Sequence, residues 1–146
     1  MEIKKKNKIL LIDNDEMTRI YFRDIFWIHG RTDTYEVILS SNLNEALLFI
    51  ENKETRPNII FIDILMEEKD GKNDTSSQIK RSYDFVTKIK GDNNYSDIKI
   101  VIYSSHKDKK VEKEFIKLGV DGFLIKGDLM PKELIAFADK VYGSNN

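Results

Sequence analysis

The sequence predicts an α/β fold in which helices cover both faces of a five-stranded parallel sheet. The prediction depends on short apolar runs and on segments of helical periodicity between them. Their alternation along the chain is typical of parallel strands joined by helical crossovers. The length of 146 residues fits one domain with a substantial core. We therefore expect a single domain over residues 1–146, with its core within about 8–142.

Five segments are predicted to be strands. Four are continuous runs of β-branched and aromatic residues, which suit strands that are buried on both faces. These runs cover residues 9–12, 59–62, 100–103 and 123–125. The remaining segment, residues 35–39, is interrupted by Glu36 and is therefore expected nearer an edge of the sheet.

The helix after the first strand shows clear periodicity. Asp15 is expected to cap its start, because a carboxylate accepts from the free amides of a first turn. Its apolar residues recur at intervals of four, four and three, and we expect them to form one inward face. They are Met17, Tyr21, Ile25 and Ile28. Gly30 is expected to end the helix, because glycine adopts the left-handed conformation without steric cost.

Four further helices are predicted along the chain. The second begins at Asn42, which forms a capping-box pattern with Glu45. Apolar spacing predicts the third around residues 85–89 and the fourth around 111–118. Asp128 is expected to cap the last helix, with Pro131 in its first turn. The polar residues 67–78 are interpreted as an exposed loop.

Composition restricts the class of protein. The net charge is −1, so we expect no basic surface for nucleic acid. The chain has no cysteine, which excludes disulfides and thiolate metal sites. No apolar run approaches the roughly 20 residues of a membrane-spanning helix, and the N-terminus lacks the apolar stretch of a signal peptide. We expect a cytoplasmic protein that binds neither nucleic acid nor membranes.

Polar residues follow the predicted strands at the sheet edge where parallel α/β folds bind ligands. Asp13 and Asn14 follow the first strand, Asp63 the third, Ser104 the fourth and Lys126 the last. Taken singly, such residues are typical of turns, caps and solvated surfaces. Together, two carboxylates suit a hard cation such as Mg²⁺. A screened carboxylate can attack a phosphoryl group, whose oxygens an ammonium and a hydroxyl can hold.

The same segments resemble the response-regulator receiver family of two-component signalling. The resemblance rests on four motifs, whose order and spacing match the family. They are residues 8–15, 58–66, 100–106 and 119–126. It covers about residues 8–142 and implies a flavodoxin-like, doubly wound sheet of strand order 2-1-3-4-5 with five helices.

The resemblance also implies roles for individual residues. Asp63 is the implied phosphoacceptor, Ser104 and Lys126 contact the phosphoryl group, and Phe123 is the aromatic switch coupled to Ser104. The implied ligands of Mg²⁺ are Asp13, Asn14, Asp63 and the backbone carbonyl of Leu65.

The implied partners follow from the same resemblance. The phosphodonor would be a histidine kinase or a histidine phosphotransfer protein. A downstream protein would bind the face formed by the fourth helix, fifth strand and fifth helix. We therefore expect a stand-alone signalling switch rather than an enzyme.

Three departures from the family pattern keep alternatives open. Asn14 replaces the usual aspartate, which removes one negative charge and predicts weaker Mg²⁺ affinity. Glu67 and Gly127 stand where the family has proline. Roughly ten extra residues precede the third helix, which exceeds an ordinary loop.

The alternative is a phosphorylation-independent interaction module of the same fold. A flavin- or nucleotide-binding protein is disfavoured, because the acidic residues 13–16 would repel phosphate.

Overall fold

A computed structural model of the chain describes residues 5–143. Strands and helices alternate along this part of the chain, and all five strands form one parallel sheet of order β2-β1-β3-β4-β5. The elements are β1 (Asn7–Ile12), α1 (Glu16–Ile28), β2 (Tyr35–Ser40), α2 (Leu43–Glu51), β3 (Ile59–Ile62), α3 (Thr75–Lys90), the short 3₁₀ helix η1 (Asn93–Tyr95), β4 (Lys99–Ser104), α4 (Lys109–Lys117), β5 (Gly122–Ile125) and α5 (Pro131–Gly143). The predicted fold class, strand order and helices are confirmed.

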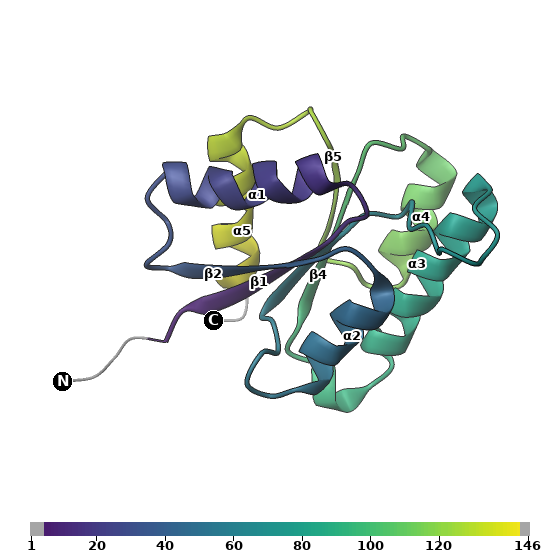
Figure 1. The fold of residues 1–146 in the computed structure, drawn as a ribbon, viewed down its shortest axis with the longest axis horizontal. Helices are drawn as coiled ribbons and strands as arrows, with labels where there is room; N and C mark the ends of the chain where they lie inside the picture. The colour runs from purple at the N-terminus through teal and green to yellow at the C-terminus, as the bar shows by residue number, and fades with distance from the viewer. Residues whose placement is uncertain (1–4, 144–146) are drawn as a thin grey trace.

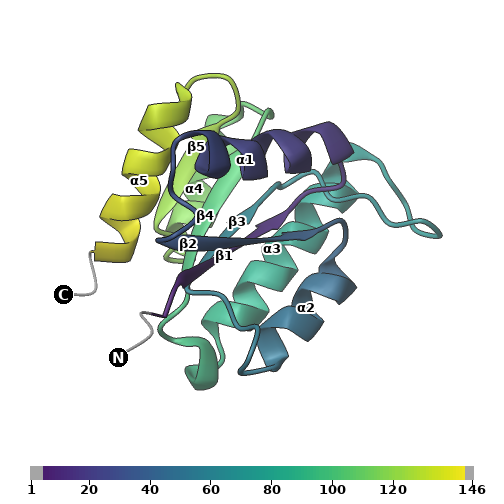
Figure 2. The ribbon, with the colours of Figure 1, turned by 60° about the vertical axis from the view of Figure 1, so that its left-hand side comes forward.

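The sheet separates two layers of helices. Helices α1 and α5 cover one face, and α2, α3 and α4 cover the other (Figures 1 and 2). Alternate side chains of a strand point to opposite faces. In β1, Ile9 and Leu11 therefore join the core beneath α1 and α5, whereas Leu10 and Ile12 join the core on the other face. None of the described helices is long and apolar enough to cross a lipid bilayer.

The two edge strands differ from the three central ones. The apolar runs of β1, β3 and β4 are buried, whereas all four residues of β5 are only half-buried. The prediction that the last apolar run is buried on both faces is wrong, because β5 has a neighbouring strand on one side only. Strand β2 forms the opposite edge, as predicted from Glu36.

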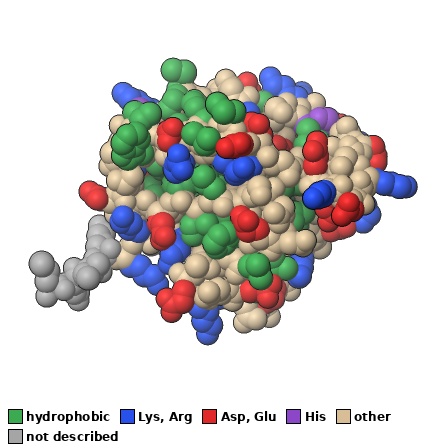
Figure 3. Space-filling view, in the orientation of Figure 1, with side chains coloured by type: hydrophobic (Ala, Val, Ile, Leu, Met, Phe, Trp, Pro, Cys, Tyr) green, Lys and Arg blue, Asp and Glu red, His purple; other side chains and the backbone are tan. Residues whose placement is uncertain are grey.

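The inward face of α1 differs from the predicted one. Of the four predicted residues only Ile25 is buried, and Phe22 and Phe26 are buried with it. Met17 and Ile28 are 70% and 71% exposed, and Tyr21 also points outward. The helix is apolar on two sides, and the ring of Phe22 decides its rotation by packing 5.1 Å from the ring of Phe61. Apolar side chains consequently gather on the surface where α1 lies (Figure 3).

The polar stretch before the third helix is shorter than predicted. Helix α3 begins at Thr75, so residues 75–78 form its first turn and the loop covers only 67–74. The carboxylate of Asp74 caps this turn by accepting from the amide and the hydroxyl of Ser77. The extra residues therefore mostly lengthen a helix, because Thr and Ser suit the first turn after a cap.

Two predicted helix caps had opposite outcomes. Asp15 caps α1 by accepting from the amide of Thr18 at 3.0 Å, as predicted. The prediction that Asp128 caps the last helix is wrong. Helix α5 begins at Pro131, and the amide just before it, that of Met130, donates to Glu133 Oε1 at 2.9 Å. The glutamate of the first turn thus reaches back to satisfy this amide.

Candidate functional site

The carboxyl ends of the central strands lie level with one another. Ile12 of β1 pairs in register with Ile62 of β3, and Ile62 pairs with Ile102 of β4. The amide of Asp63 donates to the carbonyl of Ile12 at 3.0 Å. Asp13 and Asp63 therefore leave their strands as neighbours at one edge of the sheet.

Four side chains meet at this edge in direct contact. Lys126 Nζ lies 2.6 Å from Asp13 Oδ2 and 2.9 Å from Asp63 Oδ2. Ser104 Oγ donates to Asp63 Oδ1 at 3.0 Å. The structure thus brings together the two carboxylates, the ammonium group and the hydroxyl that sequence alone placed at four separate strand ends. We call Asp13, Asp63, Ser104 and Lys126 the acidic cluster.

Burial shapes the electrostatics of the acidic cluster. Asp13 is 1% and Asp63 7% exposed, and Ser104 is fully buried. Burial raises the pKa of Asp13, although contact with Lys126 acts in the opposite direction. Burial also opposes the charge of Lys126, but Asp63 and Asp13 outweigh it and raise its pKa above the ordinary lysine value. Lys126 therefore remains a cation at neutral pH.

Backbone amides fix the orientation of both carboxylates. The amide of Asp15 donates to Asp13 Oδ1, and the amide of Leu65 donates to Asp63 Oδ1, each at 2.9 Å. In both cases the donor lies two residues after the aspartate, which is the geometry of an Asx turn. The amide of His106 donates in the same way to Ser104 Oγ at 3.2 Å. The side chains of Asp13, Asp63 and Ser104 are thus held by the loops that follow their own strands.

Asn14 lies beside the acidic cluster but contacts a different part of the chain. Its Oδ1 accepts from the amide of Glu67 at 2.7 Å, and its Nδ2 donates to the carbonyls of Ser41 at 2.9 Å and Glu67 at 3.5 Å. The side chain therefore ties the end of β1 to the loop after β3. Its amide oxygen keeps a second lone pair, which a cation can still use.

The donors around the acidic cluster suit a hard cation. They are carboxylate, amide and backbone carbonyl oxygens, the ligands that Mg²⁺ prefers. The carbonyl of Leu65 accepts no hydrogen bond from any described residue. Over residues 5–143, no three His, Cys, Asp or Glu side chains gather as a metal cluster. A cation here would therefore need the amide or carbonyl oxygen as well as the two carboxylates.

Phe123 lies near the acidic cluster on the next strand. It pairs in register with Ile102 of β4, two residues before Ser104, so its side chain lies on the same sheet face as that of Ser104. Its ring centroid lies 6.4 Å from that of Phe115 on α4. The half-buried aromatic ring thus links the strand beside the cluster to α4.

Sequence reasoning missed three residues that hold the loops around the cluster. Ser82 Oγ donates to the carbonyls of Asp63 and Ile64, and Arg81 Nη1 donates to the carbonyl of Met66. Arg19 Nη1 donates to the carbonyl of Asp13 at 2.8 Å. The sequence contained one signal for Ser82. It lies one helical turn before the apolar residues that predicted the third helix, which places its hydroxyl on the buried face of that helix. A buried hydroxyl needs a hydrogen-bond partner.

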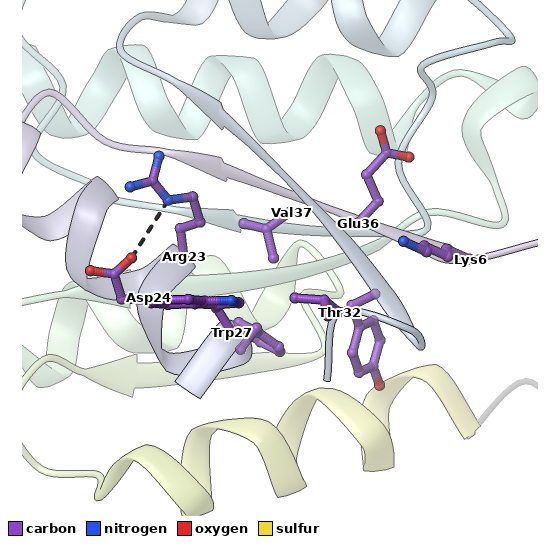
Figure 4. A pocket seen from close by; sticks show the side chains of 9 residues that line it. Lys6, Arg23, Asp24, Trp27, Thr32, Glu36 and Val37 are labelled. Carbon is purple, nitrogen blue, oxygen red and sulfur yellow. Dashed lines mark ion pairs between the residues drawn. The ribbon is translucent and has the colours of Figure 1, made fainter. Parts of the chain in front are cut away.

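A surface cavity of about 470 Å³ lies away from the acidic cluster. It is lined by residues at the end of α1 and along β2, including Trp27 and Val37 (Figure 4). Arg23 and Asp24 form an ion pair of 3.6 Å at its rim. Because no member of the acidic cluster lines it, the candidate site is the cluster and not this cavity.

Comparisons with known proteins agree with the fold. The family model described as response regulator receiver domain matches residues 9–138. A response regulator from Thermotoga maritima is 16% identical over 95% of this chain and 99% of its own, with a TM-score of 0.74. A receiver domain protein from Methanospirillum hungatei is 18% identical over 96% of both chains, with a TM-score of 0.73. The chemotaxis response regulator CheY4 of Vibrio cholerae is 19% identical over 94% of this chain and 99% of its own, with a TM-score of 0.71.

Proposed function

The chain belongs to the response regulator receiver domain family, and from this premise we propose that it is a signalling switch that accepts a phosphoryl group on Asp63. The phosphodonor is a histidine kinase or a histidine phosphotransfer protein. One observation carries the proposal. The carboxylate of Asp63 is held between Lys126 Nζ, at 2.9 Å, and Ser104 Oγ, at 3.0 Å. An ammonium group and a hydroxyl thus stand where the oxygens of an incoming phosphoryl group need partners.

The proposed reaction is a displacement at phosphorus. A carboxylate oxygen of Asp63 forms a bond to the phosphorus of a phosphohistidine while the phosphorus–nitrogen bond breaks, and the histidine leaves as imidazole. The side chain of Asp63 retains 10% exposure, which gives the donor access. Lys126 exchanges its contact with Asp63 for one with a phosphoryl oxygen. The amide of Leu65, bonded to Asp63 Oδ1, keeps the carboxylate oriented.

A divalent cation, Mg²⁺, belongs to this proposal. The residues proposed to hold it are Asp13, Asn14, Asp63 and the carbonyl of Leu65. When bound, the cation screens the negative charge that otherwise repels the phosphoryl group. The two carboxylates carry two negative charges and Lys126 one positive charge, so the cluster keeps a net negative charge that attracts a cation.

The signal would leave the site through Ser104 and Phe123. A phosphoryl oxygen competes with Asp63 for the hydroxyl of Ser104, which moves the end of β4. Phe123 lies on the same sheet face and packs on Phe115 of α4. The proposed output is a changed surface over α4, β5 and α5, to which a downstream protein binds.

Phosphorylation by acetyl phosphate tests this function. The intact protein gains the mass of one phosphoryl group in the presence of Mg²⁺ and not in excess chelator. Asp63→Asn abolishes the gain, because the amide is no nucleophile but keeps the shape of the side chain. Asp84→Asn is the matched control, since Asp84 is exposed and pairs with Lys80 on the outside of α3. Uptake by Asp63→Asn would place the acceptor elsewhere.

A second candidate function is supported by the contacts of Asn14. Its amide oxygen is already engaged with Glu67 at 2.7 Å, and Lys126 already neutralises part of the charge of Asp13 and Asp63. Both contacts favour a receiver fold that binds partners without phosphorylation. Absence of phosphoryl and beryllofluoride uptake by the wild-type protein in Mg²⁺ would support this candidate over the first.

A further inference from the structure

The loop after β3 is held by side chains from other elements, and one of its carbonyls is left without such a partner. Ser82 Oγ donates to the carbonyl of Ile64 at 2.9 Å and Arg81 Nη1 to that of Met66 at 2.7 Å. Both donors come from α3. Within residues 63–67, only the carbonyl of Leu65 accepts no hydrogen bond from a described residue.

The two peptide groups that flank the Leu65 carbonyl are each fixed at both ends. The peptide joining Ile64 to Leu65 has its carbonyl bound by Ser82 and its amide bound by Asp63 Oδ1. The peptide joining Met66 to Glu67 has its carbonyl bound by Arg81 and its amide bound by Asn14 Oδ1. Because peptide groups are planar, fixing both neighbours restricts the direction of the carbonyl between them.

The two α3 side chains are themselves firmly placed. Ser82 is 0% exposed, so its single hydroxyl proton needs an internal acceptor, and the carbonyl of Ile64 is its nearest one. The side chain of Arg81 is only 16% exposed, and its Nε also contacts Glu68 Oε2 at 3.3 Å. A planar guanidinium that is held at two points loses little further freedom when it binds a carbonyl.

We propose that Ser82 and Arg81 are positioning residues that hold residues 63–66 so that the Leu65 carbonyl is available to a divalent cation bound by Asp13 and Asp63. This inference rests on the proposed function, because it assigns α3 a part in the cation site of the same reaction. It also gives the lengthened α3 a role beyond covering the sheet. Two residues near the middle of α3 thereby shape the loop that follows the acceptor residue.

The test uses two variants and two matched controls in the full chain. Ser82→Ala removes the hydroxyl, and Arg81→Met removes the guanidinium. Ser40→Ala removes another buried hydroxyl, which donates at 2.8 Å to the carbonyl of Asn42 and does not touch the loop. Lys80→Met removes a neighbouring positive charge that pairs with Asp84. If the buried Ser82 variant fails to fold, the half-buried Arg81 carries the test.

The first readout is amide hydrogen exchange of Leu65 and Glu67 in metal-free protein, resolved by NMR. We expect at least fivefold faster exchange in Ser82→Ala and Arg81→Met and wild-type rates in both controls. The second readout is the affinity for Mg²⁺, measured by calorimetry. We expect at least fivefold weaker binding in the same two variants, with binding by both controls within twofold of wild type.

The outcomes distinguish a failure of the positioning role from a failure of the proposed function. Wild-type exchange rates in both α3 variants overturn the positioning role, even if phosphoryl uptake is normal. Faster exchange with unchanged Mg²⁺ affinity overturns the link to the cation. Wild-type protein that binds Mg²⁺ but takes up no phosphoryl group contradicts the proposed function, while the two readouts still decide the role of Ser82 and Arg81.

Discussion

Lys126 Nζ lies 2.6 Å from Asp13 Oδ2, although the two residues are 113 positions apart in the sequence. The contact joins the ends of β1 and β5, the first and last strands in the chain. Strand β3 lies between them in the sheet, and its Asp63 shares the same ammonium group. One lysine therefore keeps two buried carboxylates together, and its removal has consequences for both stability and chemistry.

Replacing Lys126 with Met is expected to slow phosphoryl uptake from acetyl phosphate at least tenfold. The variant loses the donor to the phosphoryl oxygens. It also leaves two buried carboxylates without a cationic partner, which costs about 2–4 kcal/mol of unfolding free energy at neutral pH. Intact mass spectrometry and urea unfolding measure the two effects. Lys107→Met is the control, because Lys107 pairs with Asp128 on the surface at 3.6 Å; equal effects of both substitutions would contradict the prediction.

Asn14→Asp is expected to tighten Mg²⁺ binding by roughly three- to tenfold, because a third carboxylate strengthens an oxygen site. The variant loses the amide donor to Ser41, so the metal-free protein is about 1 kcal/mol less stable. Calorimetry and urea unfolding in chelator measure the two changes. Weaker Mg²⁺ binding in the variant would show that the amide donor to Ser41 matters more for the site than the added charge.

Asp139→Asn is expected to destabilise the protein by about 1–2 kcal/mol. The carboxylate accepts two hydrogen bonds from Arg31, at 2.9 and 2.6 Å, and one from the hydroxyl of Tyr35. These contacts join α5 to the first residue of β2 and to the segment before it. The partial exposure of the ion pair keeps the effect modest. Urea unfolding measures it, and Asp24→Asn, which removes an exposed pair with Arg23, should change stability by less than about 0.5 kcal/mol.

The stability of the protein is expected to fall above about pH 10, and part of this dependence belongs to Tyr35. Burial, followed by the contact with Asp139, raises the pKa of Tyr35 in the folded state. A raised pKa contributes stability that is complete below the unfolded-state value and is lost as the pH rises through the folded-state value. Above about pH 10, the unfolding free energy of Tyr35→Phe therefore falls less steeply with pH than that of the wild type. The difference is up to about 1.4 kcal/mol per pH unit.

Urea unfolding of wild type and Tyr35→Phe between pH 8 and 11 measures this difference. Burial also raises the pKa of Tyr103, so a residual slope is expected in the variant. Parallel curves for the two proteins would contradict the assignment to Tyr35.

Gly122→Ala is expected to destabilise the protein by about 1–3 kcal/mol. A Cβ at this position in β5 would overlap the ring of Phe137 on α5. The ring must then move away from the sheet edge that it covers. Thermal unfolding measures the loss. Gly143→Ala is the control, because a Cβ there meets no atom within 4 Å; equal stability of the two variants would show that Phe137 moves freely.

Apolar patterning along the chain was enough to locate the strands and to identify the polar groups at the edge of the sheet. Apolar runs located β1, β3 and β4, and the residues directly after them supplied Asp13, Asp63 and Ser104. This works because parallel strands all end at the same edge, so a residue's place after its strand already implies its place in space. The strand order followed from the family resemblance, since alternation alone permits several orders.

Three features depend on how the layers pack in the folded protein: the buried face of α1, the first residue of α3 and the contacts that hold the loop after β3. Helical periodicity locates an apolar face but does not choose between two of them, and the packing of Phe22 on Phe61 made that choice. The contact of Asn14 with Glu67 spans 53 positions, and that of Ser82 with Ile64 spans 18. Such hydrogen bonds depend on donor direction and distance after the layers have packed. No local pattern in the sequence encodes them.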